Sequence, residues 1–339
     1  MTSNGDEPLR VVPVRHVGRW FAGAGVIVII AMMIHTFLSK IPTGQKICHV
    51  VASSADHKVF RCVDVMQWRF SWDVVGKYVT SSNILKGLLM TLALTGLTMV
   101  IGVALGATVA IMRLSTSRIL AAPAWLFTWF FRGTPVYVQL LFWFNIAAIF
   151  PTIDFGIPFG PSLWHIEAVN LFTPFTAALV GLGLNEGAYM SEIIRGGILA
   201  VDEGQVEAAN SVGLSRLQTL RLVVLPQAMR VIIPPTGNEV ISMLKTSSLA
   251  SALAVVELLK AAQNVYASTY EVIPLLIVAS IWYLIVTTIL SIGQFYIERH
   301  FSKGSLRNLP MTPWERIVRD SRGVVGKIRT PRGLRGVRA

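Results

Sequence analysis

The chain has 339 residues, of which 53% are hydrophobic and 14% charged, and its mean hydropathy is +0.59. Soluble globular domains carry about 25% charged residues, so this composition excludes an ordinary soluble fold, a disordered chain, a collagen and a disulfide-dense secreted module. The formal net charge of +12 is explained more simply by basic residues in cytoplasmic loops than by nucleic-acid binding. We therefore expect a membrane protein with several spans and no nucleic-acid partner.

The sequence contains none of the short motifs that hold a metal or a nucleotide. The two cysteines, Cys48 and Cys62, do not form a C-x-x-C pair. Gly326-Lys327 lacks the upstream Gly and the following Ser or Thr of a Walker A loop, and there is no H-E-x-x-H. We expect no catalytic residue, no metal and no cofactor bound by this chain, so that any ATP used would be held by another subunit.

The first apolar run, residues 20–38, follows a polar segment, residues 1–19, that contains three arginines. A helix of this length, at ~1.5 Å per residue, is long enough for a bilayer core of ~30 Å. A cleaved signal peptide is the alternative, but the run is long and no small-x-small cleavage site follows it. The sequence therefore predicts a transmembrane helix preceded by a cytoplasmic tail.

Residues 39–83 are mixed and charged, and we expect them to form an extracytoplasmic loop that contains both cysteines. An oxidising compartment would allow a disulfide between Cys48 and Cys62. Closing a loop of ~15 residues would stabilise the fold by roughly 3 kcal/mol. Two unpaired thiols are the alternative.

The second span is predicted over residues 84–112. Gly102 and Gly106 form a small-x-x-x-small pattern in it, which lets another helix approach closely. The alternative is that these are merely the glycines common in membrane helices.

The next apolar stretch, residues 119–150, is interrupted around Arg132, which one straight span would bury at high cost. We therefore predict an interfacial helix over residues 119–131 and then a separate span that runs to Phe150. Thr134 would be its N-cap and Pro135 its first helical residue.

Three further spans are predicted over residues 174–195, 236–259 and 273–297, separated by segments 151–173, 196–235 and 260–272. Counting Lys and Arg by loop places 19 on the side of both chain ends and 7 on the other side. The positive-inside rule then makes both termini cytoplasmic, although six of the seven lie in residues 39–83 and run against it. Residues 301–339 would be a basic cytoplasmic tail.

The segment 196–235 is polar and has the local signals of two short helices. Two capping-box patterns open them: Asp202 with Gln205, and Ser215 with Gln218. Gly213 suits the left-handed position between the helices, and the second helix is expected to end near Pro226. Such a pair is marginally stable alone and would need a partner groove that receives a helix. An ordinary solvated helical hairpin is the alternative.

The same segment resembles the EAA loop of ATP-binding-cassette importer permeases, through Glu207-Ala208-Ala209, Gly213 four residues later, and Val223, Leu225 and Pro226. Other motifs, in the same order, are similar to those of the polar amino-acid permease family: Phe131-Arg132-Gly133-Thr134-Pro135, Leu184-Asn185-Glu186-Gly187-Ala188-Tyr189, Arg195-Gly196-Gly197-Ile198, Leu225-Pro226-Gln227-Ala228-Met229-Arg230 and Pro234-Pro235-Thr236-Gly237-Asn238. The resemblance covers residues 84–300. It implies an all-α membrane protein in which a five-helix type I importer core is preceded here by one extra helix, six transmembrane helices in all.

The resemblance also implies partners. The EAA helix would be a coupling helix in a cleft of an ATPase subunit, where Glu207 would contact a basic group. The implied coupling residues are Glu207, Ala208, Ala209, Gly213, Leu214 and Pro226. A dimer of ATPases would hold ATP and Mg, a second permease (identical or homologous) would complete the pathway, and an extracytoplasmic binding protein would deliver the amino acid. The location implied is the bacterial cytoplasmic membrane.

Polar groups inside spans are candidates for the substrate path because burying them in a membrane is costly. The candidates are Asn185, Glu186, Asn238, Glu239, Lys245 and Thr134. Glu186 and Glu239 would receive the ammonium group of an amino acid, and Lys245 or the helix start at Thr134 its carboxylate.

Structural pairings are the alternative for several of these groups. Glu186 would then simply neutralise Lys245 within the bundle. Glu192 and Arg195, three residues apart on a helix, would pair with each other.

The alternative function is an ion-coupled secondary transporter or channel with Glu186 and Lys245 in an ion path and no ATPase partner. The absence of a visible inverted repeat counts against it. A membrane scaffold without transport is disfavoured by the polar residues inside the spans.

Overall fold

The computed structural model describes residues 27–35, 39–53, 58–68, 71–156 and 162–301. By its internal contacts the chain divides into two units, residues 1–77 and 78–339. The predicted tails over residues 1–19 and beyond residue 301 lie outside the described residues, as does most of the predicted first span.

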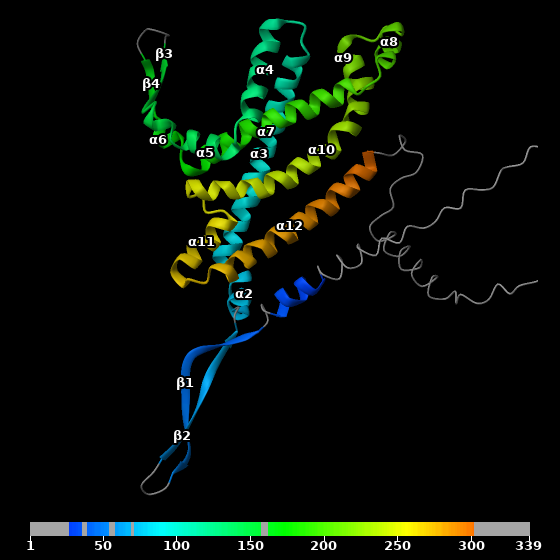
Figure 1. The fold of residues 1–339 in the computed structure, drawn as a ribbon. Helices are drawn as coiled ribbons and strands as arrows, with labels where there is room; N and C mark the ends of the chain where they lie inside the picture. Colours follow the sequence, from blue (N-terminus) through cyan, green and yellow to red (C-terminus); the bar gives the residue numbers. More distant parts are fainter. Residues whose placement is uncertain (1–26, 36–38, 54–57, 69–70, 157–161, 302–339) are drawn as a thin grey trace, which may run out of the picture. The chain divides into compact units, whose positions relative to one another are not determined.

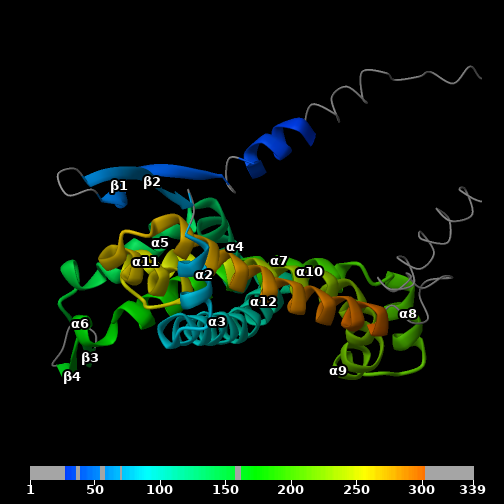
Figure 2. The ribbon, with the colours of Figure 1, turned by 90° about the horizontal axis from the view of Figure 1, so that it is seen from below.

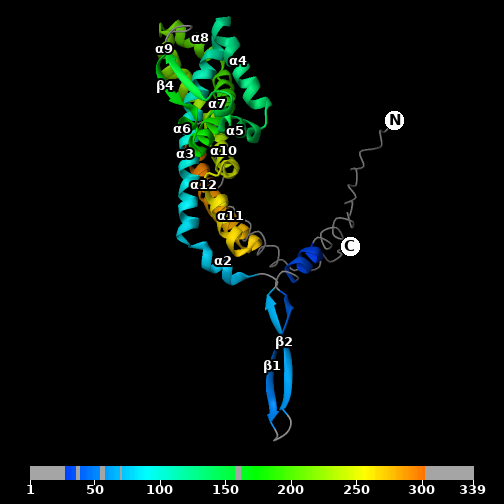
Figure 3. The same ribbon diagram turned by 90° about the vertical axis from the view of Figure 1, so that its left-hand side faces the viewer.

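In the first unit, residues 27–35 are helical, inside the predicted first span. The predicted extracytoplasmic loop contains a hairpin of two antiparallel strands, β1 (Lys40–Ser53) and β2 (Lys58–Trp68), which Figures 1 and 3 show side by side. Many of its residues are β-branched or aromatic, which favours strands. The register makes Cys48 the backbone partner of Cys62. The short helix α2 (Trp72–Val79) follows the hairpin.

The second unit is a helical bundle (Figure 1). Its main helices are α3 (Ser82–Leu114), α4 (Arg118–Gly133), α5 (Val136–Phe144), α7 (Pro174–Leu199), α10 (Leu225–Thr246), α11 (Leu258–Thr269) and α12 (Val272–Phe301). The shorter elements are η1 (Ile146–Ala148), β3 (Thr152–Gly156), β4 (Ser162–Glu167), α6 (Ala168–Leu171), α8 (Glu203–Ser211), α9 (Arg216–Thr219), η2 (Leu220–Val224) and η3 (Ser247–Leu253).

Within the described part of the chain, α3 and α12 are each long and apolar enough to cross a bilayer. A third candidate runs from Arg216 to Leu253 and continues in α11 after a bend of 46°. The count of six transmembrane helices stays a prediction.

Helices α3 and α7 pack closely against each other. A Cβ atom added at Gly102 would overlap the side chain of Glu186, and one added at Gly106 would overlap Met190. Two helices can approach this closely only where one of them presents no side chain. The prediction that the small-x-x-x-small pattern allows another helix to approach closely is confirmed. This close approach fixes the position of Glu186 beside α3.

The predicted break around Arg132 is confirmed, but its details were wrong. Thr134 is the C-cap of α4 rather than the N-cap of the next helix, and its hydroxyl donates to the carbonyl of Phe130 (2.9 Å). Thr134 is extended, as the residue before a proline usually is. Pro135 is extended as well (ψ 130°) and is the N-cap of α5. The following helix ends at Phe144 instead of continuing to Phe150.

The expected interfacial helix corresponds to α4, which packs beside α3 (Figure 1). Arg113 of α3 donates to the hydroxyl of Thr128 on α4 (2.9 Å). Trp125 and Trp129 are exposed and stack on each other. Location at the membrane interface stays a prediction for this helix.

Pro226 does not end the second helix of the polar segment, as the sequence suggested. The helical path is continuous from Arg216 to Thr246, and the wider π turn of η2 immediately precedes the proline. The N–H of Leu225 donates to the carbonyl of Leu220, five residues back. We attribute the continuity to this wider turn, which changes the register where the proline ring would meet a preceding carbonyl.

The predicted continuous span 236–259 and loop 260–272 were also wrong. The helix begins earlier, with α10, and η3 leads to a left-handed residue, Ala254 (φ 65°), before α11 starts. The fully buried carboxylate of Glu257 caps α11 by accepting from the N–H groups of Leu259 (2.8 Å) and Lys260 (2.7 Å). Glutamate is outside the usual set of N-cap residues, so the sequence carries no clear signal for this start.

Candidate functional site

The segment that resembles the EAA loop folds as two short helices joined by a tight turn. Asp202 caps α8 because its side chain accepts from the N–H of Gly204 (2.8 Å), so the N-cap is confirmed. The capping box with Gln205 does not form, and the N–H of Gln205 donates to the backbone carbonyl of Asp202 instead (3.0 Å). Gly213 has φ +83°, the left-handed conformation that was predicted. Ser215 and Gln218 form the predicted capping box of α9. These local features hold the turn between the two helices.

One face of this segment is attached to the protein and another is free. Ala209 is buried and anchors α8, whereas Glu207, Ala208 and Pro226 are exposed and Leu214 is half-buried. Three large apolar side chains near the turn are strongly exposed: Val212, Leu217 and Leu222. Figures 1 and 2 show α8 and α9 at the opposite end of the second unit from β3 and β4. Exposed apolar groups in a polar segment are typical of a docking surface.

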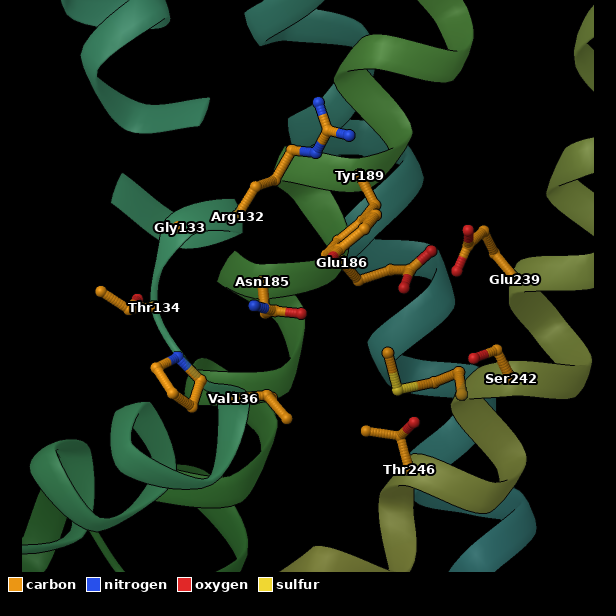
Figure 4. A pocket seen from close by; sticks show the side chains of 12 residues that line it. Arg132, Gly133, Thr134, Val136, Asn185, Glu186, Tyr189, Glu239, Ser242 and Thr246 are labelled. Carbon is orange, nitrogen blue, oxygen red and sulfur yellow. The ribbon is translucent and has the colours of Figure 1, made fainter. Parts of the chain in front are cut away.

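A cavity of about 510 Å³ opens between the break that separates α4 from α5, the middle of α7 and the C-terminal half of α10 (Figure 4). Its polar lining includes Arg132, Thr134, Asn185, Glu186, Glu239 and Ser242. Four of the six predicted path residues are therefore brought together: Thr134, Asn185, Glu186 and Glu239. Arg132, Tyr189 and Ser242 also line the cavity, although they were not predicted to belong to the substrate path.

Glu186 is the most unusual group of the cavity. Its residue is only 2% exposed, and its Oε1 atom has no hydrogen-bond partner. Figure 4 shows its carboxylate turned toward Glu239, which comes from α10 on the other side of the cavity. A buried carboxylate oxygen without a partner is destabilising. A cation in the cavity would satisfy both carboxylates.

A network of amide groups sets the shape of the cavity at the helix break. The Nδ2 atom of Asn185 donates to the carbonyl of Phe131 (2.9 Å) and to Oε1 of Gln139 (3.2 Å). The Nε2 atom of Gln139 donates in turn to the hydroxyl of Thr134 (2.7 Å). Because both amide hydrogens of Asn185 are used on one side, its oxygen is left facing the cavity, as Figure 4 shows.

Lys245 and Asn238 do not reach this cavity. Glu239, Ser242 and Thr246 share one face of α10, spaced by three and four residues. Lys245 is exposed on another face, where it lines a separate cavity with Tyr283. The oxygen of Asn238 accepts from Gln294 of α12 (3.1 Å).

The suggested ion pair of Glu186 with Lys245 was therefore wrong. Neither residue belongs to any of the ion pairs formed in the part of the chain that the structure describes.

Glu192 pairs with Arg195 as the sequence suggested, with N–O distances of 2.7 and 3.1 Å. It is also the hydrogen-bond acceptor of Arg113 from α3, and the guanidinium of Arg132 lies 3.9 Å away. Three arginines from three helices thus converge on one carboxylate. Arg132 additionally lies over the ring of Tyr189, 5.2 Å from its centre.

Comparison with known proteins agrees with this arrangement. Residues 99–303 match the family described as "Binding-protein-dependent transport system inner membrane component". The chain is 41% identical to the arginine transport system permease protein ArgU of Corynebacterium glutamicum, over 89% of this chain and 86% of that protein. It is 36% identical to the histidine/lysine/arginine/ornithine transport system permease protein HisM of Escherichia coli, over 60% of this chain and 82% of that protein.

The chain is also similar to solved structures of transporters. A crystal structure described as an amino acid ABC transporter with histidines superposes with a TM-score of 0.57 and 34% sequence identity, and the match covers 69% of this chain and all of that one. The MetNI methionine ABC transporter, at 17% identity and a TM-score of 0.53, shares the fold over 65% of this chain and 97% of its own.

Proposed function

The chain belongs to the family of binding-protein-dependent transport system inner membrane components, and from this premise we propose a pathway and a coupling surface for it. It is a permease subunit of an ATP-binding-cassette importer of polar amino acids, a multi-pass protein of the inner membrane, and not itself an enzyme. The alternative of an ion-coupled carrier or channel is not favoured by these relatives.

For coupling, we propose that α8 is the helix that enters a cleft of the ATPase subunit. The exposed Glu207 and Ala208, the turn at Gly213 and the exposed apolar side chains beside it support this role. Two ATPase subunits with ATP and Mg would act on two permeases, each with one such helix. An extracytoplasmic binding protein would deliver the substrate. The predicted topology of six spans with both termini in the cytoplasm is compatible with this arrangement, because it would place the coupling segment in the cytoplasm as well.

For the pathway, we propose that the cavity between α5, α7 and α10 carries an amino acid with a second cationic group. The observation that carries this proposal is the unpartnered carboxylate oxygen of Glu186, which faces Glu239. Two carboxylates at one end of a cavity would attract an ammonium or guanidinium group and repel an acidic side chain. The substrates in the names of the two relatives above, arginine, histidine, lysine and ornithine, agree with this choice.

Uptake of labelled arginine, competed by unlabelled amino acids, tests the substrate class. The vesicles would contain the complete importer with its binding protein and ATP. We expect lysine and ornithine to compete and glutamate to have no effect at a hundredfold excess, because it would bring a third carboxylate to Glu186 and Glu239. Competition by glutamate as strong as that by lysine would reject a cation-selective pathway.

We further propose that Cys48 and Cys62 form a disulfide on the extracytoplasmic side. They are backbone partners in the regular stretch of the hairpin between its two register shifts. Residues directly opposite on antiparallel strands have the backbone separation that a disulfide requires. Peptide mapping of protein extracted under alkylating, non-reducing conditions should find the two cysteines linked. Recovery of both as alkylated thiols would contradict the proposal.

A further inference from the structure

We propose that Arg132 receives the α-carboxylate of the substrate, so that the cavity recognises an amino acid at both ends. This inference rests on the proposed function, since it concerns the same cavity. It replaces the role that the sequence suggested for Lys245 and for a helix start at Thr134. Neither is able to fill that role, because Lys245 faces another cavity and Thr134 ends α4.

Arg132 is the one cationic side chain among the described residues that line the cavity. Arg132 lies in the last turn of α4, one residue before Gly133, at which the helix ends. Figure 4 shows its guanidinium turned away from Glu186 and Glu239. The cavity therefore has a cationic end and an anionic end, which is the charge pattern that complements a lysine or arginine lying along it.

The guanidinium of Arg132 makes a long ion pair with Glu192 but no hydrogen bond to any of the described residues. Glu192 already accepts hydrogen bonds from Arg113 and Arg195, and Arg132 lies 3.9 Å from it, beyond hydrogen-bond distance. The ring of Tyr189 orients the guanidinium without using its N–H donors. The side chain remains 44% exposed. Its planar fork of donors is free to bind a carboxylate through two parallel hydrogen bonds.

The amide oxygen of Asn185 supplies a third contact between the two ends. It faces the cavity because its own amide hydrogens are held by Phe131 and Gln139. An acceptor at this position is suited to the α-ammonium group, while Arg132 takes the α-carboxylate and the two glutamates take the distal cation. Each charged group of a basic amino acid then has a partner of opposite charge or a hydrogen-bond acceptor.

Equilibrium binding of lysine and lysinamide to the importer in nanodiscs, without the binding protein, tests this inference. Lysinamide keeps both ammonium groups and lacks the carboxylate. The wild-type importer should bind lysine at least tenfold more tightly than lysinamide, since charge-assisted hydrogen bonds to Arg132 are made only with lysine. Arg132→Gln should remove this preference, because it should lower the affinity for lysine and leave the affinity for lysinamide unchanged. Arg132→Lys should restore part of the preference.

Arg118→Gln is the matched control, because it removes one positive charge from the other end of the same helix, outside the cavity. It should leave the preference for lysine intact. Equal affinity of the wild-type importer for lysine and lysinamide would overturn the role of Arg132 without needing any variant to fold. An Arg132→Gln variant whose affinities for lysine and lysinamide fall equally would also overturn the role of Arg132. Neither result would remove the cationic pathway, whereas failure of the wild-type importer to bind either ligand would overturn both proposals.

Discussion

Glu207→Arg is expected to abolish ATP-driven uptake while leaving the chain in the membrane at its normal level. Glu207 is exposed on α8, where it is free to meet a basic group of an ATPase subunit. Reversing its charge replaces an attraction at a protein interface by a repulsion. Loss of one partner of such a pair costs about 2–5 kcal/mol, which corresponds to a loss of affinity of at least about thirtyfold. Co-purification of the ATPase subunit and uptake in vesicles would be measured together.

Glu167→Arg is the matched control for this substitution. Glu167 is also an exposed glutamate, but it belongs to β4, at the other end of the second unit from α8 (Figure 1). The same charge reversal there should leave the ATPase bound. The coupling role of α8 would be rejected by a Glu207→Arg variant that retains its ATPase and its ATP-driven uptake.

Glu186→Gln combined with Glu239→Gln is expected to lower uptake of lysine by two orders of magnitude or more at low substrate concentration. The exchange keeps the size of both side chains but removes both negative charges from the cavity end that would hold the distal cation. In each single variant, uptake at low lysine concentration should fall roughly tenfold, on the order expected for the loss of a hydrogen bond to a charged group. Initial rates over a range of lysine concentrations would show the change in apparent KM.

Lys245→Gln provides the control for the two glutamate variants. Lys245 is a charged residue of the same helix as Glu239, but it faces away from the cavity. We expect uptake by this variant to match the wild type. If Lys245→Gln were as defective as Glu186→Gln, while Glu239→Gln transported normally, the pathway would not lie in this cavity.

The parts of the site that depend on neighbours in the sequence were predictable from it. A turn after α8 needs a residue with positive φ, and Gly213 provides it. The capping box of Ser215 is a contact across three residues. Arg132 is a charged residue in an apolar run of the sequence, and burying it in a membrane is costly. Its neighbours in the sequence were therefore enough to predict a helix break. The glycines of α3 similarly indicated a close helix contact, although not its partner α7.

The parts that depend on packing were not predictable. Glu239 and Lys245 both lie on α10, but only the rotation of this helix about its axis decides that Glu239 meets the cavity and Lys245 does not. The continuity through Pro226 depends on a π turn, and the start of α11 depends on a glutamate held between α3 and α12 through Thr91 and Tyr283. Residues far apart in the sequence determine each of these features, so the pattern of residues in one segment does not reveal them.

Uptake of labelled lysine into sealed vesicles would show whether this chain forms a pathway for basic amino acids that is driven by a separate ATPase. The vesicles would contain this chain with its partner permease, the ATPase subunits and the binding protein. We predict uptake that requires ATP on the cytoplasmic side, stops when the ATPase is omitted, and is not restored by a proton or sodium gradient. Uptake of lysine driven by an ion gradient in vesicles without the ATPase would contradict the account.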